Sequence, residues 1–291
     1  MRRHLIRAAA AAALLIAARA SAVEPTLGGP RDQWPSEITR RPLTLGAGMV
    51  EVWAPVQLNA SKDADWKPVT SNPSIAFGVT DQWMIGFRHV VGLCIGNEAD
   101  GCVRGKHYDD VGAFTRISVL RGAGLDAAVQ GAVHVSPLSG SDHNWSADAS
   151  VLLRAGGGAV AVTVQPTVGF GLNDRDTRLS RLTPIAWNFG TYDVITPGST
   201  VGNREHASLP VTLQLQLGPA LALAVGASLE GPLNPVVGSF EDYYTIPAGA
   251  GVVFTPLRYL DVGATFTFPN FGGKQDTRDV RQLALFVAFR I

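Results

Sequence analysis

Apolar residues take every second position from Leu209 to Leu217, and again from Leu221 to Leu229. The positions between them carry polar or small residues such as Gln214, Gln216 and Ala222. A helix would place apolar residues every three or four positions, so a period of two predicts β-strands. Each run approaches the roughly 9–11 residues that a tilted strand needs to cross a bilayer. The pair, joined at Gly218-Pro219, therefore predicts a membrane-spanning hairpin.

The same alternation recurs along most of the chain and predicts about twelve strands. The expected strands cover 43–53, 74–80, 83–87, 110–120, 127–135, 147–153, 160–172, 209–217, 221–229, 244–254, 260–268 and 283–291. Short turns near residues 81, 122, 157, 218 and 256 alternate with long loops at 54–72, 94–109, 137–145, 173–206, 231–242 and 270–280. This order predicts an all-β fold, a closed antiparallel up-and-down transmembrane barrel, formed by residues 42–291 as one domain.

Composition supports a wall that faces lipid. The mean hydropathy is +0.14, only 16% of residues are charged, and glycine occurs 32 times. A soluble exported chain of this size usually carries more charge. The formal net charge is zero, which gives no reason to expect a nucleic-acid partner.

The N-terminus has the pattern of an export signal. Arg2, Arg3 and Arg7 precede the apolar stretch 8–18, and Ala20-Ser21-Ala22 supplies small residues for cleavage. We therefore expect residues 1–22 to be a signal peptide, because the stretch is too short for a helical membrane anchor. The polar residues 23–41 are expected to form a periplasmic lead-in to the barrel.

Two segments carry a family resemblance. Residues 284–291 resemble the terminal strand of bacterial outer-membrane β-barrel proteins, although that class usually ends on an aromatic residue and this chain ends on Ile291. Residues 77–86 resemble a periplasmic hairpin of such barrels. The resemblance implies an outer-membrane location, contact with outer-membrane lipid and lipopolysaccharide, and assembly by periplasmic chaperones and the barrel-insertion machinery. It does not point to a particular subfamily.

The alternation also predicts which polar side chains face the lumen. The inward set comprises Arg88, Arg116, Gln130, His134, Arg154, Gln165, Gln214, Gln216, Glu230, Asp261, Gln282 and Arg290. Either these charges pair across a filled interior, or they line a water-filled channel and tune its selectivity. Glu51 does not fit, because the expected parity of the first strand places it on the lipid side, where only a bulge or a headgroup position would accommodate it.

Loop 173–206 is the longest, and long loops without regular structure are often functional. It is expected either to cover the barrel as a polar lid or to fold its apolar middle, around Ile185 and Trp187, into the mouth. Cys94 and Cys102 are eight residues apart in another loop. A disulfide is expected in an exported chain, and a metal site would lack nearby histidines.

His134 and Ser136 resemble the His-x-Ser pair of outer-membrane lipid hydrolases. Spacing i, i+2 places both side chains on one face, as a base and a nucleophile require, with Asp142, Asn144 or Asp148 as an orienting partner. Their parity points to the lumen, whereas those families place the pair toward lipid, and Pro137 follows where a phospholipase has Asn-Gly.

We therefore expect a passive channel or transport protein for small polar solutes, without a cofactor or a metal. A non-conducting structural or surface-display barrel is the second interpretation. A lipid hydrolase using His134 and Ser136 is the third.

Overall fold

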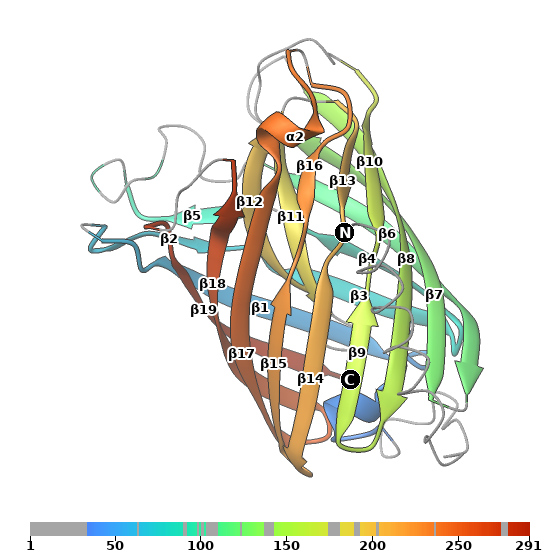
Figure 1. Ribbon diagram of the computed structural model, residues 1–291. Helices are drawn as coiled ribbons and strands as arrows, with labels where there is room; N and C mark the ends of the chain where they lie inside the picture. The colour runs from blue at the N-terminus through green and yellow to red at the C-terminus, as the bar shows by residue number, and fades with distance from the viewer. Residues whose placement is uncertain are drawn as a thin grey trace, which may run out of the picture.

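A computed structural model describes residues 34–62, 64–89, 92–97, 99, 102, 110–122, 124–136, 143–173, 181–188, 193–201, 204–235, 237–274 and 279–291. The expected signal peptide lies outside these residues. The strands form a closed twelve-stranded antiparallel barrel, as the alternation predicts (Figure 1). Within the described part of the chain, no helix is long and apolar enough to span a membrane.

Several wall strands consist of two segments in line. The twelve wall strands are β1 (Val50–Asn59), β2 with β3 (Trp66–Ser71, Ser74–Thr80), β4 with β5 (Trp83–Arg88, Leu93–Ile95), β6 (Val111–Gly122), β7 (Leu125–Ser136), β8 (Asn144–Gly157), β9 with β10 (Val160–Val164, Thr167–Gly171), β13 with β14 (His206–Ser208, Val211–Gly218), β15 with β16 (Leu221–Ala227, Glu230–Pro232), β17 (Thr245–Leu257), β18 (Leu260–Gly273) and β19 (Gln282–Arg290).

The barrel closes between its first and last strands. β1 pairs antiparallel with β19 from Glu51↔Arg290 to Asn59↔Gln282. At the turn end, the Val50 amide donates to the Ile291 carbonyl at 2.8 Å, and the Ile291 amide donates back at 2.9 Å. Closure leaves no free sheet edge in the wall, which is what a spanning β-structure requires.

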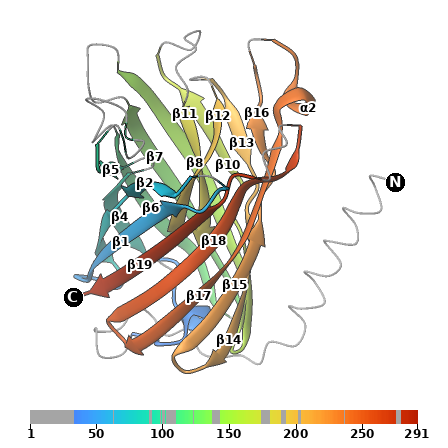
Figure 2. The same cartoon turned by 90° about the vertical axis from the view of Figure 1, so that its left-hand side faces the viewer.

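Two long loops are shorter or more ordered than expected. The predicted loop 54–72 is largely wrong, because β1 continues to Asn59 and β2 begins at Trp66. Within 173–206, β11 (Arg181–Asn188) and β12 (Asp193–Val201) form an antiparallel hairpin. Its backbone contacts the wall strands β14, β16 and β18, and both views draw the hairpin within the outline of the barrel near its long-loop end (Figures 1 and 2). This placement agrees with the interpretation that the loop folds into the mouth.

The first predicted strand is wrong in its N-terminal half. Residues 43–49 are not part of the wall, and β1 begins only at Val50. Residues 34–49, here called the plug, lie inside the barrel at its turn end and contain the short 3₁₀ helix η2 (Ile38–Arg40). The expected lead-in ends at Arg41, but Trp34 to Arg41 already belong to this inserted segment.

Candidate functional site: the barrel interior and its plug

The interior carries the polar residues that the alternation places inward. Ten of the twelve residues predicted to face inward are at most 6% exposed: Arg88, Arg116, Gln130, His134, Arg154, Gln165, Gln214, Glu230, Asp261 and Arg290. Gln282 is half-buried. Gln216 is half-buried and lies next to a turn, where its Nε2 donates to the Gly218 carbonyl at 2.6 Å. Water therefore reaches little of this polar surface.

Apolar contacts fill the interior around the plug. Its side chains pack into three separate clusters against inward-facing wall residues. Ile38 packs with Trp53, Val253 and Phe286; Trp34, Leu45 and Met49 pack with Ala76, Met84 and Phe114; Leu43 packs with Ala128 and Leu152. Because each large apolar side chain gains about 1.5–3 kcal/mol on full burial, these clusters favour the inserted position strongly.

A buried ionic network fixes the centre of the plug. The Arg41 guanidinium donates to both carboxylate oxygens of Asp261, from Nη1 to Oδ2 at 2.5 Å and from Nη2 to Oδ1 at 2.8 Å. Arg290 binds the same carboxylate at 2.8 Å and Glu51 at 2.7 Å. Two cations and two anions thus cancel, so the network satisfies the requirement that buried charges be paired.

Glu51 faces the interior, and the expected outward parity of the first strand is therefore wrong. Val52 and Val56 are 39% and 41% exposed on the lipid side, whereas Glu51 is only 2% exposed. The error arose because Leu43 and Leu45 alternate with opposite parity but belong to the plug. The alternation of Val50, Val52, Ala54 and Val56 alone would have given the correct face.

The wall also binds the backbone of the plug. Arg116 Nη1 donates to the Leu43 carbonyl at 3.1 Å, and Arg154 Nη2 donates to the Arg41 carbonyl. Thr39 Oγ1 donates at 2.5 Å to the carbonyl of Gly158 in a short turn. These bonds satisfy plug groups that would otherwise be buried without partners.

The turn at Asp81-Gln82 holds the C-terminal part of the plug. The Asp81 carbonyl accepts from Thr44 Oγ1 at 2.9 Å, and its carboxylate accepts from the Ala47 amide at 2.9 Å. Gly78 on β3 lies against the Gly46 carbonyl so closely that a Cβ would collide with it. Only glycine permits this approach of two backbones.

A second polar cluster lies nearer the loop end. His134 Nε2 is 3.0 Å from Asp148 Oδ2, and His206 Nε2 is 3.7 Å from Asp148 Oδ1. Arg88 Nη2 lies 3.3 Å from His134 Nε2. Among the described residues, no group of three His, Cys, Asp or Glu side chains has the arrangement of a metal site.

The catalytic hypothesis gains one contact from this cluster. Of the three orienting partners considered, Asp148 contacts His134, Asn144 pairs in register with Ser136, and Asp142 lies outside the described residues. His134 is 6% exposed and inside the barrel, away from the lipid that a hydrolase would attack. The geometry therefore suits a structural cluster better than a lipid-cleaving site.

The two cysteines are joined. Cys94 and Cys102 form a disulfide with Cα atoms 5.8 Å apart, which confirms the pairing expected from export. β5 carries Cys94 and pairs with β2, so the bond constrains the loop that follows the third wall strand.

Sequence reasoning missed the roles of Arg41, Glu51 and His206. The sequence pattern places Arg41 in the lead-in and His206 at the end of the predicted loop 173–206. One signal was available for Arg41: the inward anions of the turn end need cations, and Arg41 precedes the first strand by only a few residues. His206 offers no such local signal, because Asp148 lies on a distant strand.

Comparisons with known proteins place the fold among porins. No protein-family model matches the chain, and no curated protein matches it. The NanC porin has a TM-score of 0.50 at 7% identity, covering 83% of this chain and 100% of the porin. The KdgM porin has a TM-score of 0.51 at 6% identity, covering 82% and 98%. An outer membrane channel from Pseudomonas putida F1 has a TM-score of 0.48 at 12% identity, covering 85% and 97%.

At these identities the likeness concerns the fold alone. The chain thus has a closed β-barrel fold similar to that of these two porins, and the barrel itself is what the alternation predicts.

Proposed function

We propose that this protein is an outer-membrane channel for small polar solutes, held closed at its turn end by its own plug. The proposal rests on the polar side chains of the wall that the plug covers. The wall behind the plug is lined by Arg, Asp, Glu and Gln, which are side chains that water solvates well. Withdrawal of the plug would therefore leave a wettable lumen.

Orientation follows from the connections. Barrels of this type keep short turns on the periplasmic side and long loops outside. The plug binds the short turns at Asp81 and Gly158, so we place it at the periplasmic mouth. A solute would reach the His134–Asp148–His206 cluster first and the plug last.

A non-conducting barrel is the second candidate. The sealed ionic network and the apolar clusters around the plug favour it, because both resemble a permanent core. In that case the protein would serve as a rigid support for the loops it displays.

Planar-bilayer recording separates the two functions. The wild-type protein is compared with a variant in which residues 34–46 are replaced by a Gly/Ser linker of equal length. We expect few openings in the wild type and stepwise conductance in the variant. A variant that folds and inserts but remains sealed at every voltage would refute the channel and leave the structural barrel.

A further inference from the structure

Small residues form a row across five neighbouring strands on the lipid face of the wall. Around Val168 of β10, the flanking partners in register are Ala149 on β8 and Ala207 on β13. The next partners outward along the row are Gly131 on β7 and Gly231 on β16. Four of these five positions therefore lack a bulky side chain.

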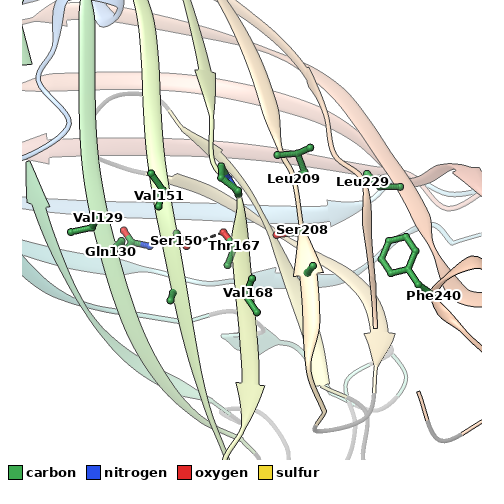
Figure 3. Close-up of a pocket in the computed structure, with 13 residues that line it drawn as sticks. Val129, Gln130, Ser150, Val151, Thr167, Val168, Ser208, Leu209, Leu229 and Phe240 are labelled. Atoms are coloured by element: carbon green, nitrogen blue, oxygen red, sulfur yellow. Dashed lines mark hydrogen bonds between the residues drawn. The ribbon is translucent and has the colours of Figure 1, made fainter. Parts of the chain in front are cut away.

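Bulky apolar residues flank this row on one side. They lie two positions closer to the short turns and comprise Val129, Val151, Pro166, Leu209 and Leu229. A groove of about 610 Å³ follows the row, with these bulky residues along one side, and its lining atoms are almost wholly apolar (Figure 3). Its size falls within the roughly 300–1,000 Å³ of ligand pockets.

Prolines interrupt the wall under the groove. Pro166 separates β9 from β10, and Pro210 separates β13 from β14. On the next strand, β17, which does not line the groove, Pro247 lies at a register shift. Since proline has no N–H to donate, the ladder is incomplete at these positions. Three backbone hydrogen bonds still join the strands at these positions. The Gln165 amide donates to the Pro210 carbonyl at 3.0 Å, the Leu209 amide to the Leu229 carbonyl at 2.9 Å, and the Ser228 amide to the Pro247 carbonyl at 2.9 Å.

Exposed aromatic residues fix the depth of the groove. Phe170 lies two residues beyond Val168 toward the loops and is 43% exposed, and Trp145 on β8 is 47% exposed. Aromatic girdles mark the two interfaces of such barrels. Two residues along a strand span about 6–7 Å, so the groove lies just inside the interface on the long-loop side.

Phe240 closes one end of the groove. Its ring covers Gly231 and stacks on Tyr244 with centroids 6.3 Å apart. The helix α2 (Phe240–Tyr243) is held by the Asp242 carboxylate, which accepts from the Ser239 amide at 2.9 Å. This bond and a second one from the Ser239 hydroxyl at 3.1 Å hold the pKa of Asp242 below its ordinary value. The end wall is thus fixed in place.

We propose that this groove is a binding site for one acyl chain of a membrane lipid in the leaflet on the long-loop side. Its surroundings in the spanning wall are hydrocarbon, and its lining is almost wholly apolar, so it offers little to the polar groups of a peptide backbone. Four strand spacings of about 4.8 Å give the row a length of about 19 Å, which is enough for a long acyl chain.

Photolabelling in vesicles tests this site. The protein is reconstituted with phosphatidylethanolamine that carries a diazirine on one acyl chain, irradiated, digested and mapped by mass spectrometry. We expect labels to concentrate on 144–157, 160–171 and 206–218. Ala149→Leu with Ala207→Leu fills the groove and should lower that labelling several-fold, whereas Ala264→Leu, on the lipid face of β18, should leave it unchanged.

Labelling spread evenly around the wall, or labelling that the double variant does not reduce, would overturn the proposal. Circular dichroism of the double variant verifies that the barrel is folded. A second arm repeats the mapping with lipid A as competitor, and loss of the label would identify lipid A as the chain donor. The test requires no conductance, so it stands apart from the channel proposal.

Discussion

Arg41→Met is the sharpest perturbation of the plug. In the wild type, the charges of Arg41, Arg290, Asp261 and Glu51 sum to zero in a site of 0–3% side-chain exposure. Methionine keeps most of the apolar stem but leaves one uncompensated negative charge when the plug is inserted. Removing one partner of a buried pair costs about 3–5 kcal/mol. At 1.4 kcal/mol per factor of ten, the inserted state should weaken between about 100-fold and a few thousand-fold.

Single-channel recording measures this shift as open probability. Arg40→Met is the matched control, because Arg40 is the neighbouring residue, its side chain is 49% exposed, and its contact with Glu37 is a surface pair. Such pairs contribute about 0–1 kcal/mol, so Arg40→Met should record like the wild type. Equal open probabilities for both variants would refute the view that the ionic network holds the plug.

Three further predictions concern the loop end. Replacing residues 181–201 by a short Gly/Ser linker in the plug-substituted protein should raise the unit conductance, because the β11–β12 hairpin folds against the wall strands β14, β16 and β18. An unchanged step size would place the hairpin off the conducting path. Iodoacetamide should add no mass to the unreduced protein and two adducts after reduction, and labelling before reduction would contradict the Cys94–Cys102 bond. Fatty-acid release from phospholipid should be equal in wild type, His134→Ala and Ser136→Ala; loss in both variants would revive the hydrolase.

The wall of the barrel was predictable because its signal is local. One face of each strand contacts lipid, so Leu213, Val225 and Leu285 alternate with small or polar residues at a period that needs no tertiary information. The number of wall strands, their antiparallel order and the disulfide followed from this pattern and from export.

The plug was not predictable in the same way. Leu43, Leu45 and Met49 have strand-like spacing, yet they are buried by side chains from many distant strands. Arg41 and Asp261 are 220 residues apart, and no local rule pairs them. Local alternation cannot distinguish a strand that faces lipid from an extended segment that lies inside the barrel.

The interior combines two kinds of contact that oppose each other in function. Apolar clusters stabilise the inserted plug, while the charged wall behind it would favour water once the plug leaves. The balance between them decides whether the lumen conducts. Replacing Gly78 by a larger residue should also shift this balance, since its Cβ would meet the Gly46 carbonyl.

The most direct test of the inserted plug is thiol labelling with a membrane-impermeant maleimide. Leu45 is fully buried, whereas Ala47, two residues away, is exposed. The native cysteines are paired and do not react. The Ala47→Cys variant should label at once in the folded barrel, and the Leu45→Cys variant only after unfolding. Equal rapid labelling of both would contradict the claim that residues 34–49 fill the turn end of the barrel.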